Sequence, residues 1–149
     1  MAKRILVPLS QSEPAGSFVA AIGDLARGGG ATVRLLHVAA PTTNVVDADG
    51  RLLAYADQEN RRVEAEARDF LEVIAITLDG VPVELAVRFG DPVPEIVAEA
   101  GDFGADLIAV GVGRRRRLRL RGSVAEQILR RSDVPVALFR AGRHETGGR

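Results

Sequence analysis

The chain has 149 residues, the length of a single domain, and it contains no cysteine. The lack of cysteine excludes a disulfide framework, a thiolate metal site and a cysteine nucleophile. Apolar residues make up 46% of the chain and charged residues 27%, which is ordinary for a globular protein. No apolar run approaches the ~18 residues of a membrane span, and the opening MAKRILVPLS is too short in apolar residues for a secretory signal. We therefore expect a soluble, cytoplasmic protein with no membrane partner.

Charge is balanced over the whole chain but unevenly spread. Six of the 20 basic residues are arginines within Arg114–Arg121, so the rest of the chain has 14 basic against 20 acidic residues. A protein that binds polyanions over its whole surface would not confine its basic residues in this way. Aromatic residues are only 4% of the chain and none lies among these arginines. This composition disfavours a protein that binds single-stranded nucleic acid by stacking its bases on aromatic side chains. A solvated surface and a phosphate-contacting loop remain the two main interpretations.

The first third of the chain predicts a strand, a helix and a second strand. RILVPL (4–9) is a short apolar run that ends in a polar cluster, which is typical of a buried strand. A helix follows, with Ser12 as a possible cap and the glycines 28–30 at its end. The run ATVRLLHVAA (31–40) is rich in branched residues and predicts the second strand.

The middle of the chain predicts a loop, a long helix and a third strand. The segment 41–53 is polar and turn-rich, with Asp49-Gly50 inside it, and we interpret it as a mobile loop. Apolar residues at helical spacing predict a helix over 54–78. In VPVELAVRF (81–89) apolar residues alternate, which indicates a strand, possibly at an edge of the sheet.

The last third predicts two helices, two strands and a tail. Asp91-Pro92 is a cap followed by proline at the first helical position. ADLIAVGVG (105–113) predicts the fourth strand, a short helix starts at Ser123, and VPVALFRA (134–141) predicts the fifth strand. The polar end GRHETGGR (142–149) is expected to be a disordered tail, so that residues 1–141 form the single domain.

Strands that alternate with helices indicate parallel pairing with right-handed crossovers. Near-continuous apolar strands are typical of a sheet that is covered on both faces. The sequence therefore predicts a doubly wound α/β domain with helices on both faces. Ligands of such sheets bind at the carboxyl ends of the strands, where the strand order reverses. The segments 8–12, 37–40 and 111–113 would line that crevice.

Four fragments in the right order resemble the universal stress protein family. They are KRILVPLSQSE, LLHVAAP, GDPVPEIVAEAGDFGADLIAVG and GSVAEQILRRSDVPVALFR, and together they extend from Lys3 to Arg140. The resemblance implies a five-stranded parallel sheet of order 3-2-1-4-5, of the adenine-nucleotide alpha-hydrolase-like type. It also implies a stress-response role as a binding or regulatory module, and a homodimer formed through the strand 135–140.

The resemblance raises the question of a nucleotide. The ATP-binding branch of the family carries Gly-x-x-Gly, then nine residues, then Gly-Ser or Gly-Thr. Here Gly111 and Gly113 are only one residue apart, and eight residues separate Gly113 from Gly122-Ser123. Ser10 also stands where the family usually has an aspartate. The pocket elements are thus partly kept and partly altered.

The resemblance implies an adenine nucleotide (ATP, ADP or AMP), with Mg²⁺ in the case of ATP, at the carboxyl ends of the first and fourth strands. A glycine turn and the first N–H groups of a helix are both suited to phosphate. An arginine beside them could bind phosphate through two hydrogen bonds. The predicted binding residues are Pro8, Leu9, Ser10, Val38, Gly111, Gly113, Arg114, Gly122, Ser123 and Val124.

Several of these residues have a structural explanation as well. Ser123 with Glu126 is a capping box, which accounts for the serine with or without a phosphate. His37, inside a predicted strand, is expected to be packed or bonded to backbone, and Asp106 to serve a turn. With no Ser-His-Asp set and no paired histidines, we predict no catalytic residue and no metal ligand. Slow ATP hydrolysis and a dimeric protein–protein scaffold without nucleotide remain the alternative functions.

Overall fold

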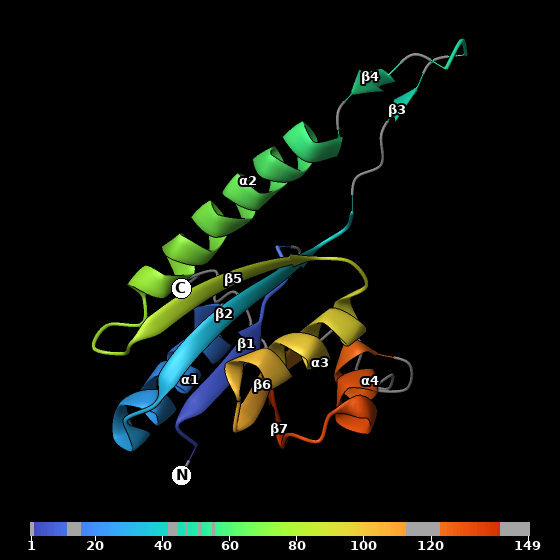
Figure 1. Cartoon of the computed structure of the whole chain (residues 1–149). Coiled ribbons are helices and arrows are strands. Elements are labelled where there is room, and N and C mark those ends of the chain that lie inside the picture. Colours follow the sequence, from blue (N-terminus) through green and yellow to red (C-terminus); the bar gives the residue numbers. More distant parts are fainter. Residues whose placement is uncertain are drawn as a thin grey trace, which may run out of the picture.

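The structure is a computed structural model, and it describes residues 2–11, 16–41, 45–46, 48–50, 52–54, 56–112 and 123–140. Strands and helices alternate as the sequence predicts (Figure 1). In chain order they are β1 (Arg4–Pro8), α1 (Gly16–Gly29), β2 (Thr32–Ala39), β3 (Val45–Val46), β4 (Leu52–Ala54), α2 (Ala56–Ile76), β5 (Val83–Phe89), α3 (Pro92–Phe103), β6 (Leu107–Val112), α4 (Val124–Arg131) and β7 (Val136–Arg140).

Five of the strands form one parallel sheet in the order β5-β2-β1-β6-β7. Counting only these five, the order is 3-2-1-4-5, so the predicted topology is confirmed. β1 lies in the middle and pairs with β2 on one side and with β6 on the other. The chain leaves β1 toward β2 and leaves β6 toward β7, so the strand order reverses between β1 and β6. This is the switch point at which ligands of such sheets bind.

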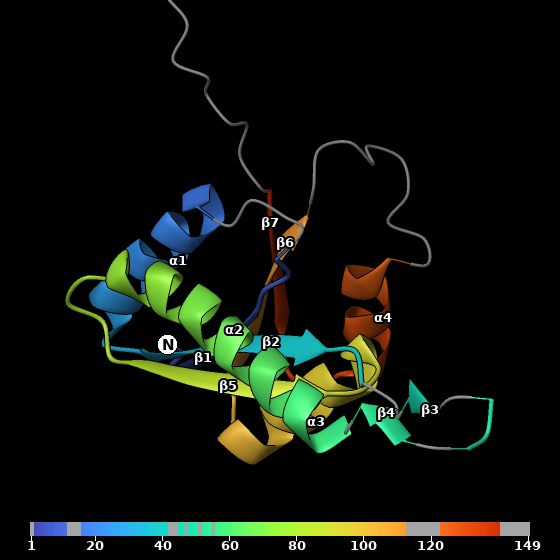
Figure 2. The same ribbon diagram turned by 90° about the horizontal axis from the view of Figure 1, so that it is seen from above.

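Helices cover both faces of the sheet, α1 and α2 on one and α3 and α4 on the other (Figure 2). Successive residues of a strand point to opposite faces. Ile5 and Val7 therefore enter the core beneath α1 and α2, whereas Leu6 enters the core beneath α3 and α4. All three are at most 1% exposed. Because each buried side chain of this size contributes about 1.5–3 kcal/mol, both faces of the central strand stabilise the fold.

The interpretation of 41–53 as a loop is wrong in part. β3 and β4 pair there as a short antiparallel ribbon, with Gly50 in the left-handed region at φ 78°. The ribbon stands beyond the five-stranded sheet, next to the start of α2 (Figure 1). Strands of two and three residues are too short to show an alternating pattern, but the Asp-Gly pair between apolar residues was the available hairpin signal.

One predicted helix cap is confirmed only in part, and another lies outside the described residues. α1 begins at Gly16, and the proposed cap Ser12 lies outside the described residues, as does the tail 142–149. Asp91 occupies the N-cap position of α3, with Pro92 in the first turn, but its side chain makes no capping hydrogen bond. α3 ends at Gly104 in the left-handed conformation (φ 66°, ψ 41°). β5 is an edge strand, which confirms the reading of its alternating pattern.

Candidate nucleotide site at the switch point

The strand registers bring several of the predicted binding residues to one level. Pro8 lies opposite Leu36 of β2, and Leu6 lies opposite Ile108 of β6. Continued to the strand ends, these registers place Ser10 beside Val38 on one side and Val112 on the other. We call the carboxyl ends of β1, β2 and β6, together with the start of α4, the switch-point edge. Of the ten predicted residues, Pro8, Leu9, Ser10, Val38 and Gly111 lie on these strand ends.

The turn after β1 is held in place by β2. The N–H of Leu9 donates to the carbonyl oxygen of Leu36 at 2.8 Å. The Nδ1 atom of His37 lies 2.9 Å from the carbonyl oxygen of Leu9, so this nitrogen carries the proton and donates it. The His37 ring also meets the ring of Phe70 edge to face, with 6.0 Å between centroids. The expectation that His37 is bonded to backbone is therefore confirmed, and the bond orients the turn that presents the exposed Ser10.

Gly111 lies in a strand and not in a turn, and its contact with a phosphate stays a prediction. It lies within β6, opposite Phe139 of β7, and its backbone is not in the left-handed region. A Cβ atom at this position would come within 2.7 Å of the Phe18 ring of α1. The glycine is thus explained by the close approach of an aromatic ring from a helix far away in sequence. The other predicted loop residues, Gly113, Arg114 and Gly122, lie outside the described part of the chain.

The start of α4 is capped as the sequence predicts. Ser123 is extended (φ −67°, ψ 158°), and its Oγ accepts a hydrogen bond from the N–H of Glu126 at 3.1 Å. The N–H groups of Val124 and Ala125 precede any carbonyl to which the helix could bond them. They form the positive end of the helix dipole, which favours an anion. The capping role of Ser123 is confirmed, and a contact with phosphate stays a prediction.

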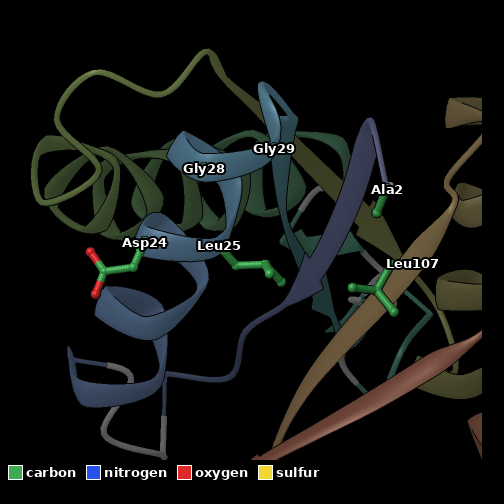
Figure 3. Close-up of a pocket in the computed structure, with 6 residues that line it drawn as sticks. All are labelled: Ala2, Asp24, Leu25, Gly28, Gly29 and Leu107. Carbon is green, nitrogen blue, oxygen red and sulfur yellow. The ribbon is translucent and has the colours of Figure 1, made fainter.

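A groove of about 410 Å³ lies at the opposite end of the sheet (Figure 3). Its lining residues come from the segment before β1, the second half of α1 and the start of β6: Ala2, Asp24, Leu25, Gly28, Gly29 and Leu107. Leu25 points from α1 toward the sheet, whereas Asp24 points away (Figure 3) and pairs with Arg27 at 2.8 Å. Because it opens at the amino ends of the strands, this groove is not the predicted nucleotide site.

The face of the sheet beneath α3 carries a cluster of charges that the sequence analysis missed. We call it the α3 charge network; it consists of Arg34 of β2, Glu84 and Arg88 of β5, and Glu95, Glu99 and Asp102 of α3. Glu99 is only 6% exposed and accepts one hydrogen bond from Arg34 and one from Arg88, each at 2.7 Å. The carboxylate therefore ties two strands to the helix.

Both arginines of this network have further contacts. Hydrogen bonds to Glu95 and then Glu99 raise the pKa of Arg88 above its ordinary value. Arg34 donates twice to Glu84, and its guanidinium carbon lies 4.1 Å from the ring centroid of Phe103. The available signal was a charged residue inside an apolar pattern: Arg34 interrupts TVRLLHVA, and Glu99 falls on the buried face of α3.

Asp106 bonds to the backbone at the amino end of β1. Its Oδ2 accepts hydrogen bonds from the N–H groups of Lys3 at 2.9 Å and Arg4 at 3.0 Å. These two backbone bonds hold the pKa of the Asp106 carboxyl below its ordinary value. The expectation that Asp106 serves a turn agrees with this geometry.

The described ranges contain neither a helix that could cross a membrane nor three side chains of histidine, aspartate or glutamate grouped to hold a metal ion. The donors at the switch-point edge are instead hydroxyl and backbone groups, with Ser10 and Ser123 as the polar side chains predicted to bind. This arrangement can hold an anion by hydrogen bonds and by a helix dipole.

Comparison with known proteins identifies relatives of this fold. The model of the universal stress protein family matches residues 1–140. No curated protein matches.

Three solved structures are similar over nearly their whole length. The hypothetical protein MJ0577, the subject of a structure-based assignment of biochemical function, is 26% identical, with a TM-score of 0.73 over 95% of this chain and 97% of that chain. A universal stress protein in complex with cAMP is 21% identical, with a TM-score of 0.64 over 95% and 98%. One from Archaeoglobus fulgidus in complex with dAMP is 19% identical, with a TM-score of 0.60 over 91% and 96%. By the family match over residues 1–140, the chain belongs to the universal stress protein family.

Proposed function

We propose that this protein is a cytoplasmic stress-response module that binds an adenine nucleotide (ATP, ADP or AMP) at the switch-point edge. The main observation in support is the strand register, which brings Ser10, Val38 and the end of β6 to one level beside α4. Two similar structures were solved with cAMP and dAMP, which supports an adenine nucleotide as the ligand. We assign no catalytic residue, and slow ATP hydrolysis at the same site remains the enzymatic alternative.

Each part of the edge has a role in this proposal. The base lies against Pro8, Leu9 and Val38, where the apolar strand ends offer a surface without charge. The phosphates lie near Gly113, Gly122 and Ser123, at the positive end of α4. Arg114 binds two oxygens of a phosphate through the N–H groups of its guanidinium. Gly111 contributes backbone groups near the phosphates, at a position where the missing Cβ also lets Phe18 approach β6.

Titration with ATP, ADP and AMP, followed by thermal shift, tests the proposal. A nucleotide at 100 times its Kd should stabilise the protein by about 2.7 kcal/mol. The variant Gly122→Val should weaken binding about tenfold, or about 1.4 kcal/mol. Gly101→Val is the matched control, because a Cβ at Gly101 meets no atom within 4 Å and lies on α3. Unchanged affinity in a folded Gly122→Val protein would place the ligand elsewhere.

The second candidate is a dimeric protein–protein scaffold that binds no nucleotide. The observation that favours it is the position of β7 at the edge of the sheet, with Leu138 45% exposed. Open edges of this kind tend to pair with another chain. We propose a homodimer through residues 135–140 for both candidates. No stabilisation by any adenine nucleotide would favour the scaffold, and phosphate release above background would favour slow hydrolysis.

The dimer has its own test. The N–H of Ile108 donates to the carbonyl oxygen of Pro135 at 2.9 Å. Because backbone groups of a strand alternate between its two sides, those of Leu138 face away from β6. Leu138→Pro should therefore remove an edge donor, keep the ladder to β6, and shift the protein toward monomer in analytical ultracentrifugation. Leu129→Lys, at a 56% exposed position on α4, is the control. A folded Leu138→Pro protein that stays dimeric would contradict this interface.

A further inference from the structure

β5 lies at an edge of the sheet, and one side of its backbone faces away from the neighbouring strand. Among the described strands, β5 pairs with β2 alone (Figure 1). The N–H of Val33 donates to the carbonyl oxygen of Pro82, and the N–H of Gly90 donates to that of Ala39. Because backbone groups of a strand alternate between its two sides, the even positions of β5 face β2. The odd positions face outward: Val83, Leu85, Val87 and Phe89.

This edge lacks the features by which proteins usually keep edge strands from pairing. Short strands, prolines and bulges are the common means. β5 has seven residues, none of which is proline, and its register with β2 runs without a shift from end to end. The side chains of Val83, Leu85 and Val87 are only partly buried against the core beneath α1 and α2. A further strand beside β5 would cover them more completely.

The charged residues of β5 make the strand complementary to itself. Glu84 and Arg88 lie on the same face of the strand, two residues before and two residues after Ala86. In an antiparallel pair of two β5 strands centred on Ala86, Glu84 lies opposite the partner's Arg88, and the reverse pair forms on the other side. The same register joins the outward positions as hydrogen-bonded pairs, 83 with 89 and 85 with 87. A register shifted by two residues would set Glu84 opposite Ala86 or Gly90, with no charge pair.

Both charges are accessible for such a contact. The side chain of Glu84 is 50% exposed and that of Arg88 is 26% exposed. Within the chain, Glu84 accepts from Arg34, and Arg88 donates to carboxylates of α3. Opposite charges that face each other across an antiparallel pair stabilise it, whereas like charges destabilise it. The alignment of Glu84 with Arg88 therefore favours a second β5 strand in this one register.

We propose that β5 is an interaction surface for a second copy of this chain, which adds its own β5 in antiparallel orientation with Ala86 on the two-fold axis. The contact lies at the opposite edge of the sheet from β7 and does not depend on the nucleotide site. Two edges of seven residues each form a smaller contact than the interfaces of stable complexes. The β5 pair is therefore weak and reversible.

Disulfide trapping tests the contact and its register, because the chain has no cysteine of its own. In the proposed pair, the two copies of position 86 face each other with Cα atoms about 4.5 Å apart, a distance that a disulfide spans. Mild oxidation of Ala86→Cys should therefore give a covalent dimer on a non-reducing gel. Leu138→Pro in the same chain should leave this trapping unchanged, since β7 lies at the other edge.

Glu84→Cys is the matched control. Position 84 is more exposed than position 86 and lies on the same face of β5. The two copies of position 84 would nevertheless be about 13 Å apart along the paired strands, which is too far for a disulfide. A folded Ala86→Cys protein that is not trapped, or equal trapping of both variants, would overturn the proposal.

A second pair of variants tests the charges. Adding Glu84→Lys to Ala86→Cys sets a positive charge opposite the partner's Arg88 on both sides of the axis, and should slow trapping about tenfold. Asp69→Lys makes the same change of charge at an exposed position of α2 and should leave the rate as it was. Equal rates for Glu84→Lys and Asp69→Lys would contradict the charge pairing.

The unsubstituted protein gives an independent measurement. Hydrogen exchange of the amides in 83–89 should slow as the protein concentration rises, because pairing protects the outward N–H groups. Glu84→Lys alone should exchange at the fast rate over the same concentrations. Exchange of this segment that does not depend on concentration in the wild-type protein would overturn the proposal even if a cysteine variant failed to fold.

Discussion

Arginine is used in two contrasting ways in this molecule. In the α3 charge network, two arginines face four carboxylates drawn from β5 and α3. In the sequence between β6 and α4, residues 113–122, six arginines occur without an acidic residue. Where the charge serves the fold, the chain supplies both signs within 2.6–3.2 Å of each other. Where the sequence supplies one sign only, in 113–122, we expect a ligand or solvent ions to provide the counter-charge.

The largest effect is expected from removing the buried carboxylate of the network. Glu99→Gln leaves Arg34 and Arg88 without their shared partner, and both arginine side chains are about three-quarters buried. Breaking a buried pair costs several kcal/mol; since each arginine keeps another carboxylate, we expect about 3 kcal/mol of lost stability. Urea denaturation measures it.

A matched substitution on the same arginine sharpens this result. Glu84 also bonds to Arg34 but is 50% exposed. An ion pair exposed to this degree contributes about 0–1 kcal/mol, so Glu84→Gln should have little effect. Equal losses of stability for Glu84→Gln and Glu99→Gln would mean that burial does not distinguish the two partners. That result would contradict the stabilising role that we assign to the buried carboxylate of the α3 charge network.

The next prediction distinguishes a structural role of Gly111 from a role in ligand binding. Gly111→Ala places a methyl group where 2.7 Å separates it from the Phe18 ring, so the helix or the ring must shift. Overpacking of this kind costs about 1–3 kcal/mol. We expect lower stability by urea denaturation and unchanged ATP affinity in the folded protein. Adding Phe18→Leu to Gly111→Ala should restore part of the lost stability. A loss of ATP affinity without a loss of stability would instead indicate that the position of Gly111 contacts the phosphates.

A smaller effect is expected from the arginines that precede α4 in the sequence. Changing Arg114–Arg117 to serine should weaken ATP binding about tenfold at low salt, or about 1.4 kcal/mol. The difference should shrink at high salt, because exposed charges are screened over about 8–10 Å near physiological ionic strength. Titration at two salt concentrations measures this. If the variant and the wild-type protein bind equally and share one salt dependence, the arginines are only a solvated surface.

The smallest effect concerns Asp106 and depends on pH. Its folded pKa lies below the ordinary value of 3.8, because the N–H groups of Lys3 and Arg4 bond to the carboxylate. A depressed carboxyl pKa stabilises the fold above the unfolded value, and this contribution is lost as the pH falls through the folded value. Asp106→Asn should therefore be less stable than wild type at pH 7, with the gap closing below pH 3.8. A gap that does not change with pH would contradict the assignment.

Much of the fold could be predicted from the sequence, because apolar runs and helical spacing are local patterns. The strand order came from the family resemblance and is confirmed. The role of Gly111 could not be read locally, since the reason for the glycine is Phe18, which lies 93 positions earlier in the sequence. The α3 charge network was missed for the same reason: Arg34 and Glu99 become partners only when α3 lies across β2.

The central place of β1 has a consequence for synthesis on the ribosome. β1 is the first strand to emerge, yet one of its two neighbours is β6, and Arg4 is bonded to Asp106, 102 positions later. At ~5–20 residues per second, this neighbour is made roughly 5–20 s after β1. During that interval β1 can pair with β2 only, and its other edge stays open. The nascent chain thus exposes an apolar strand that later lies in the centre of the sheet. Such a segment is a suitable substrate for chaperones that bind exposed apolar segments and prevent their aggregation.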